Sequence, residues 1–292
     1  MGDCCTDDTE QVVESVGDPR VTFVNLPVNS GEQAAPNNRG VAMARGRYVA
    51  FLNQDDLYFP DHLSRAVEEL ERSGADIVWV PCASILPATD EELSAGCWAA
   101  ELWGVPPTLR SDSGYSPLAF YCASSWVLRR DVCERVGPWR DPGQLYVTPS
   151  QDWLFRASKA GATIRFVPHV SVLLIPSGAR RGSYDRRTSP EHEYFAALMR
   201  DDPAFRERLL ESAAVNTART AQHRLLRRPV AALRRAVVFP VWAVLDRVGV
   251  HPFSVDNLLR SGGRGRHIRR IHRFAGLNRP QPGGRLRRRR RR

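Results

Sequence analysis

Two neighbouring carboxylates follow directly on an apolar stretch of the chain. Residues 48–52 are nearly all apolar, and Asn53-Gln54-Asp55-Asp56 comes immediately after them. Like charges at the end of a buried strand repel each other unless a cation neutralises them. Mg²⁺ and Mn²⁺ take carboxylate oxygens together with substrate phosphates. The pattern indicates a metal-assisted site for a phosphorylated substrate; the alternative is an ordinary aspartate cap for the next helix.

A third acidic residue stands at the start of another predicted helix. Ser150-Gln151-Asp152-Trp153 opens a helix that we expect to run to Ala160, with Ser150 as its N-cap. Asp152 then lies in the first turn, where the helix dipole favours a negative charge. An ionised carboxylate can act as a general base. The alternative is that Asp152 only stabilises the helix start.

Strands alternate with helices around these residues. We predict helices at 6–16, 31–46 and 60–74, the last with Leu63, Val67 and Leu70 on its buried face, and strands at 20–24, 48–52 and 75–80. This order predicts an α/β fold with a mostly parallel sheet, whose ligand lies at the carboxyl ends of the strands. The chain opens on a helix, so we expect the first strand of the domain to be missing.

The charge of the chain is divided unevenly. Residues 1–178 hold 14 basic and 23 acidic residues, a net charge of −9, whereas residues 179–292 carry +19. An acidic first part suits an enzyme acting on small molecules, and an arginine-rich second part suits a polyanionic surface. We therefore divide the chain into a catalytic domain at 1–178, a basic helical extension at 179–278 and a disordered arginine-rich tail at 279–292.

The start of the chain, its cysteines and its apolar runs predict where in the cell the protein lies. Residues 1–5 do not form a signal peptide, and the six cysteines have no C-x-x-C spacing. The longest apolar run is too short to span a bilayer, so we expect a cytoplasmic protein. The apolar and basic stretch 230–248 and the arginine tail favour a peripheral position on the inner membrane face. The alternative for 230–248 is a helix packed on the catalytic domain.

Four blocks of the sequence resemble family 2 glycosyltransferases, which have the GT-A fold. They are the residues 2–9, the segment 29–48 that leads into an apolar strand, the acidic turn with its flanks at 48–63, and Ser150-Gln151-Asp152-Trp153-Leu154. Their order and spacing fit the family over residues 2–175. Asn53 departs from the family pattern, which has Asp there. An amide brings no charge, so a metal would depend on Asp55, with Asp56 as a helix cap.

The resemblance implies an inverting transfer of a sugar from a nucleotide-sugar to an acceptor hydroxyl. Asp152 would be the catalytic base and Asp55 the ligand of Mn²⁺ or Mg²⁺. The nucleotide-sugar would be bound by Asp3, Asn38, Asn53 and Asp55. Trp126 would line the acceptor side, with plain core packing as the alternative. Trp153 would exclude water or support the acceptor.

The expected partners are a nucleotide-sugar donor, a glycan or lipid-linked acceptor and an anionic membrane surface at the C-terminal arginines; nucleic acid is not expected. The alternative function is a non-catalytic protein of the same fold. In that case Asn53 marks a degenerate pocket, and the arginine-rich C-terminus binds nucleic acid or another anionic surface.

Overall fold

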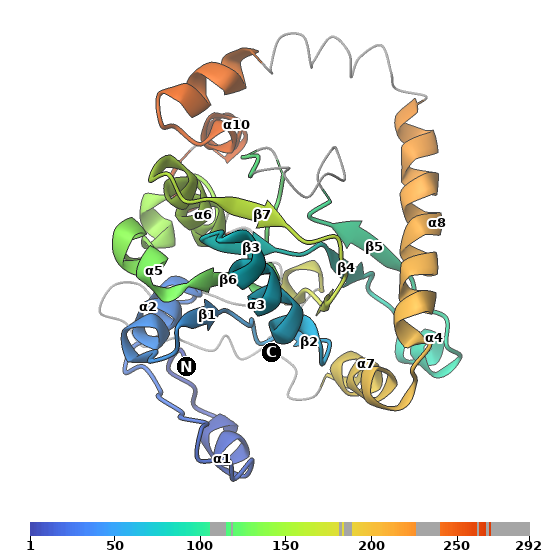
Figure 1. The fold of residues 1–292 in the computed structure, drawn as a ribbon. Coiled ribbons are helices and arrows are strands. Elements are labelled where there is room, and N and C mark those ends of the chain that lie inside the picture. Colours follow the sequence, from blue (N-terminus) through green and yellow to red (C-terminus); the bar gives the residue numbers. More distant parts are fainter. Residues whose placement is uncertain are drawn as a thin grey trace, which may run out of the picture.

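The structure is a computed structural model and describes residues 1–105, 115–117, 119–180, 183, 189–225, 240–261, 263–266 and 269. Its described strands form two four-stranded sheets (Figure 1). The first has the order β1 (Tyr48–Ala50), β6 (Trp126–Arg129), β3 (Ile77–Trp79), β7 (Ile164–Phe166). The second has the order β2 (Asp56–Tyr58), β8 (Val172–Leu174), β4 (Cys82–Ile85), β5 (Ala100–Trp103).

Both sheets are mixed. The pairs β3–β7 and β4–β8 are parallel, and the other described pairs are antiparallel. The α/β class is therefore confirmed, but the sheets are not mostly parallel as predicted. The physical reason is that β6 runs against both of its neighbours. In the second sheet, β5 returns along β4 after only the short helix α4 (Asp90–Ser94), a connection that antiparallel strands permit.

The predicted strand at 20–24 is wrong. The Gly2 amide donates to the Val24 carbonyl over 2.9 Å, and the Leu26 amide donates to the Gly2 carbonyl over 2.8 Å. These bonds make one isolated parallel bridge between Gly2 and Asn25. β-Branched residues favour extended backbone, but a strand also needs a continuous partner. The neighbouring helices are α1 (Thr9–Glu14) and α2 (Ala34–Met43).

Helix α3 (His62–Ser73) ends at Gly74, as predicted. Gly74 has φ +69°, a left-handed conformation that glycine adopts without strain. The predicted buried face is only partly right, because Leu63 is 48% exposed. The helix begins behind Asp61, and its buried row has a spacing of four residues: His62, Ala66 and Leu70.

Helix α6 (Pro149–Lys159) carries the predicted base. Its N-cap is Thr148 rather than Ser150: the Gln151 amide donates to Thr148 Oγ1 over 3.3 Å, and the Thr148 amide donates to Gln151 Oε1 over 3.1 Å. This reciprocal pair satisfies two helix-end donors, and Pro149 has no N–H to satisfy. Asp152 still lies in the first turn, as predicted.

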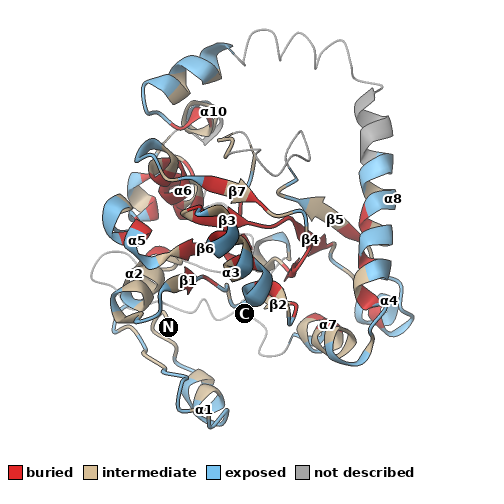
Figure 2. Cartoon of the chain, viewed as in Figure 1, coloured by how far each residue is buried: buried red, intermediate tan, exposed pale blue. Residues whose placement is uncertain are grey.

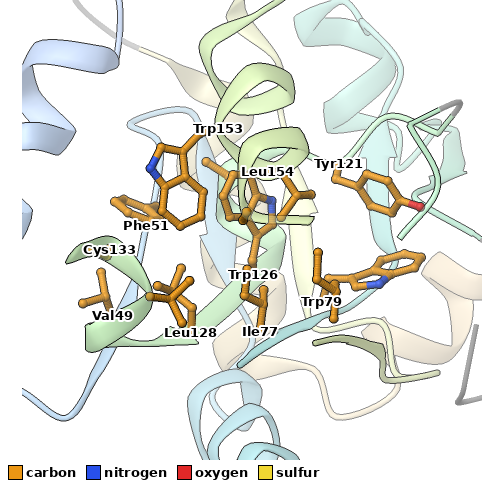
Figure 3. Close-up of a cluster of buried hydrophobic side chains, with 14 of the residues drawn as sticks. Val49, Phe51, Ile77, Trp79, Tyr121, Trp126, Leu128, Cys133, Trp153 and Leu154 are labelled. Atoms are coloured by element: carbon orange, nitrogen blue, oxygen red, sulfur yellow. The ribbon is translucent and has the colours of Figure 1, made fainter. Parts of the chain in front are cut away.

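A stack of tryptophans fills the core between the first sheet and α6. The rings of Trp126, Trp139 and Trp153 lie nearly parallel, with centroids 5.6–5.7 Å apart. Phe51 meets Trp126 and Trp139 edge-on. Figure 3 shows Phe51, Trp126 and Trp153 converging beneath the helix. Helix α5 (Arg130–Val136) closes the side of this core.

A second core joins the C-terminal helices to the second sheet. Helices α7 (Pro190–Asp201) and α8 (Phe205–Leu225) bury Phe195 and Phe205 completely, against residues of β4, β5 and β8. The buried residues of Figure 2 run through both sheets and into the inner face of α8. The chain continues in helix 240–247 and α10 (Pro252–Ser261), so the described part of the chain after 189 is mainly helical, as predicted.

Two parts of the predicted C-terminal region, 230–239 and the tail 279–292, lie outside the described residues. Among the helices that the structure describes, none combines the length and the apolar character that a bilayer crossing requires.

Candidate active site

The acidic turn connects the two sheets. The chain leaves β1 at Ala50 and enters β2 at Asp56. The Tyr58 hydroxyl donates to the Phe51 carbonyl over 2.6 Å and so closes the turn on itself. The Ile175 amide donates to the Asp55 carbonyl over 3.1 Å, which continues the ladder between β2 and β8. The turn is thus fixed by backbone contacts on both sides.

Asp56 is a buried strand residue and not the helix cap that the sequence predicted. Its side chain is 6% exposed. Asp56 Oδ2 accepts hydrogen bonds from the Ser124 hydroxyl over 2.5 Å and from the Asn53 side-chain Nδ2 over 3.0 Å. Asp61, and not Asp56, precedes the first turn of α3. The carboxylate therefore organises the turn from within.

The surroundings of Asp56 disfavour the ionised form of its carboxyl group. Its pKa is raised to about 7 because the side chain is buried and the Asp55 charge lies nearby. The hydrogen bonds from Ser124 and Asn53 oppose that rise. This is the electrostatic situation that the sequence predicted for paired carboxylates, and a cation at the turn would relieve it.

Asp55 is half-buried and reaches the segment after β8. Its Oδ2 accepts a hydrogen bond from the Ser177 amide over 2.7 Å, at the start of the 3-10 turn η3 (Ser177–Ala179). Within the described residues, no cluster of three or more His, Cys, Asp or Glu could hold a metal by itself. One carboxylate beside an amide fits a hard cation that takes its other ligands from water and substrate phosphates.

Asp3 binds a loop of the same domain. Asp3 Oδ1 accepts from the Ser30 amide over 2.8 Å and from the Ser30 hydroxyl over 2.9 Å. Asp3 Oδ2 accepts from the Gly31 amide over 2.7 Å. The carboxylate thus organises the turn at 30–31, ahead of α2. Its role in nucleotide binding stays a prediction.

Asn38 is engaged at both ends of its amide group. Asn38 Nδ2 donates to the Trp139 carbonyl over 2.9 Å, and the Trp139 amide donates to Asn38 Oδ1 over 2.8 Å. These contacts tie α2 to the loop between α5 and α6. The assignment of Asn38 to nucleotide-sugar binding also stays a prediction.

Asp152 lies between two arginines. The Arg156 Nε donates to Asp152 Oδ2 over 2.9 Å, and the Arg140 guanidinium lies 3.4 Å from Oδ1. Arg156 also donates to the Val136 and Pro138 carbonyls, both over 2.7 Å. Asp152 Oδ2 is therefore held in place by the fold through Arg156. Asp152 Oδ1 faces the half-exposed side chain of Arg140.

Trp126 and Trp153 lie in the core, which was the alternative for Trp126. Their exposed fractions are 0% and 1%. The Trp153 Nε1 donates to the Gly137 carbonyl over 3.0 Å. In this structure the Trp126 ring stacks on Trp153 of α6 and so supports that helix. The contact of either ring with an acceptor stays a prediction.

The structure brings Asn53 and Asp56 together with Ser124, a residue that the sequence did not single out. Ser124 also accepts from the Asn53 amide N–H over 3.1 Å, and it is completely buried. It lies 68 residues from Asp56 in the chain, so no local pattern marks it. Trp126, two residues after Ser124, stacks on Trp153, the neighbour of Asp152. This contact links the acidic turn to helix α6.

The comparisons with known proteins agree with the motifs. Residues 2–137 match the family model described as glycosyl transferase family 2. The succinoglycan biosynthesis protein ExoO of Rhizobium meliloti is 41% identical over 77 residues, which are 26% of this chain and 22% of that protein. The putative teichuronic acid biosynthesis glycosyltransferase TuaG of Bacillus subtilis is 41% identical over 78 residues, 26% of this chain and 31% of that protein. The chain therefore spans less than a third of these relatives.

Solved structures also resemble the chain. The structure of S. aureus TarS 1–349 in complex with UDP-GlcNAc has 17% identity and a TM-score of 0.48, and the likeness covers 67% of this chain and 53% of that one. The mannosyltransferase PcManGT from Pyrobaculum calidifontis, in complex with GDP-Man and Mn²⁺, has 16% identity and a TM-score of 0.45, covering 88% and 76%. By its motifs and its family match, the segment 2–137 of the chain is similar to glycosyltransferase family 2.

Proposed function

We propose that this protein is an inverting, metal-dependent glycosyltransferase that moves a sugar from a nucleotide-sugar to an acceptor hydroxyl in glycan or glycolipid synthesis. The observation that carries the proposal is the turn 53–56, where a buried Asp56 lies beside Asp55 within the segment matched by the family. The two named relatives belong to succinoglycan and teichuronic acid biosynthesis, which supports a polysaccharide pathway.

In this proposal each site residue has one task. Asp152 takes the proton from the acceptor hydroxyl as it attacks the anomeric carbon. Asp55 holds Mn²⁺ or Mg²⁺, and such a cation stabilises the departing nucleoside diphosphate as a Lewis acid. Asn53, Asp3 and Asn38 contact the donor. Trp126 and Trp153 are assigned to the acceptor side. In the structure their rings stack on each other and support α6.

We propose the boundaries 1–178, 179–278 and 279–292 for the catalytic domain, the basic helical extension and the tail. The protein would work at the cytoplasmic membrane face, near a lipid-linked acceptor, with the arginine tail as one anionic-surface contact.

The proposal is tested by a donor panel. UDP-, GDP- and dTDP-sugars are incubated with the protein and Mn²⁺, and the release of nucleoside diphosphate is measured. We expect slow hydrolysis of one donor class and its loss with a chelator. A well-folded protein that binds and hydrolyses none of them would contradict the function.

Asp152→Asn should lower transfer at least about 100-fold, because the amide cannot accept the acceptor proton. Nucleotide binding, measured by calorimetry, should stay nearly unchanged. Asparagine keeps the contact with Arg156 in part, and thermal unfolding checks that the helix is intact. A folded variant with activity within a few-fold of the parent would remove Asp152 from this role.

Asp55→Ala should abolish the part of nucleotide affinity that depends on Mn²⁺ or Mg²⁺, because the half-buried carboxylate supplies the protein's charge to the cation. The measurement is calorimetric titration with a nucleoside diphosphate, with and without the metal. Asp131→Ala, at an exposed carboxylate on α5, is the matched control. An equal metal response in both variants would show that Asp55 holds no cation.

Asp56 should make stability depend on pH in the absence of divalent cations. Its pKa is about 7 in the fold and about 4 when unfolded, so the folded state keeps a proton that the unfolded chain has lost. The contribution of Asp56 to stability should therefore be greatest below about pH 4 and fall by up to about 1.4 kcal/mol per unit until about pH 7.

Asp56→Asn should remove that contribution, so urea midpoints of variant and parent should diverge between about pH 4 and about pH 7, in favour of the variant, and stay apart above that range. Asp131→Asn serves as the exposed control. Parallel pH profiles of Asp56→Asn and the parent would contradict the burial of a charge at this position.

A further inference from the structure

Exposed apolar side chains gather in one short part of the chain. The described residues hold 18 large hydrophobic side chains that are exposed to solvent, and a third of them lie within residues 241–259. They are Val241, Val244, Val248, Val250, Leu258 and Leu259. Single exposed apolar side chains are ordinary, whereas exposed apolar side chains that occur together indicate a contact surface.

Helix 240–247 turns its apolar stripe outward. Val241, Val244 and Val248 follow one another at spacings of three and four residues, with exposed fractions of 51%, 59% and 66%. Trp242 and Leu245 are half-buried and border this stripe, and the Trp242 ring meets Phe253 edge-on. An amphipathic helix of a globular domain normally directs its apolar face to the core. This helix buries only part of its apolar face and leaves Val241, Val244 and Val248 exposed.

The exposed charges in this part of the chain have one sign. Among residues 240–269 whose exposure the structure describes, the charged side chains classed as exposed are Arg247, Arg264, Arg266 and Arg269. The acidic residues there, Asp246 and Asp256, are half-buried, and Asp246 pairs with Lys159 over 2.8 Å. A surface with outward valines and only cationic exposed charge is complementary to an anionic bilayer.

The segment is fixed to the helix that carries Asp152. Besides the Lys159–Asp246 ion pair, the buried His251 packs on Phe155 of α6, with ring centroids 5.1 Å apart. Asn257 Nδ2 donates to the Tyr146 carbonyl over 2.8 Å, just before α6. Figure 1 shows α10 and the helix before it at the end of the molecule that holds α6. Whatever binds this surface is therefore held at a set position relative to α6.

We propose that the outer stripe of helix 240–247, Val241, Val244 and Val248, enters the interface of an anionic lipid bilayer, with Arg247 at the phosphate level. The surface is distinct from the tail 279–292. That it would present a lipid-linked acceptor beside α6 rests on the proposed function; the binding of lipid does not. A single-signed charge around a narrow stripe favours lipid over a protein partner, whose surface would also offer basic groups.

The test is flotation of the full chain with two vesicle types, one of phosphatidylcholine alone and one with about 30% phosphatidylglycerol. The parent should float with the anionic vesicles only. The double variant Val241→Asp/Val244→Asp should bind them at least about 10-fold more weakly, since two carboxylates oppose both insertion and charge attraction.

The matched control is Val12→Asp/Val16→Asp, which alters two valines of similar exposure, 59% and 63%, at and just beyond α1. It should bind as the parent does, within about twofold. Equal binding by parent and stripe variant, equal loss in the control, or capture by a protein without vesicle binding would overturn the proposal. Thermal unfolding checks that each variant folds. Nucleotide titration of the same samples tests the proposed function separately, since a chain that floats but binds no nucleotide disproves only that function.

Discussion

The burial of Asp56 beside Asp55 is the constraint on which the rest of the site depends. A carboxylate in the interior is unfavourable unless donors satisfy it. Here Ser124 and Asn53 supply those donors, and the pKa of Asp56 is still raised to about 7. Because Ser124 comes from the segment before β6, the turn can form only after distant parts of the chain have met.

Aromatic packing connects the acidic turn to helix α6, which carries Asp152. Phe51 precedes the turn and meets Trp126 and Trp139 edge-on, while Trp126 follows Ser124 and stacks on Trp153. Trp153 is the neighbour of Asp152. Stacked rings in a close-packed core leave few alternative positions. The two acidic centres are therefore held by one rigid cluster, which suits a reaction that needs fixed geometry.

The sequence could predict what short-range physics decides. Gly74 ends α3, Asp152 lies in the first turn of α6, and the acidic residues follow an apolar strand, because each depends on residues a few positions away. The same reasoning misplaced the cap of α6 by two residues. It also gave a strand at 20–24, where the chain finds only a single bridge.

Long-range contacts were beyond sequence reasoning. Asp56 was expected to cap a helix, but its pairing with Leu174 in β8 makes it a strand residue. Trp126 and Trp153 could be acceptor platforms or core from their types alone, and the packing of three tryptophans places them in the core. For the stretch 230–248 the sequence left open whether it meets a membrane interface or packs on the catalytic domain. The exposure of Val241, Val244 and Val248 in the fold shows which of its side chains face outward.

The most direct test of the central claim, that the turn 53–56 receives the donor's diphosphate, is a crystal structure with a nucleoside diphosphate and Mn²⁺. The account predicts the metal on Asp55, the diphosphate at the turn, and the contact between the Ser177 amide and Asp55 opened or rearranged to admit them. A nucleotide bound at another face, with the turn unchanged and Asp55 still closed by Ser177, would contradict it.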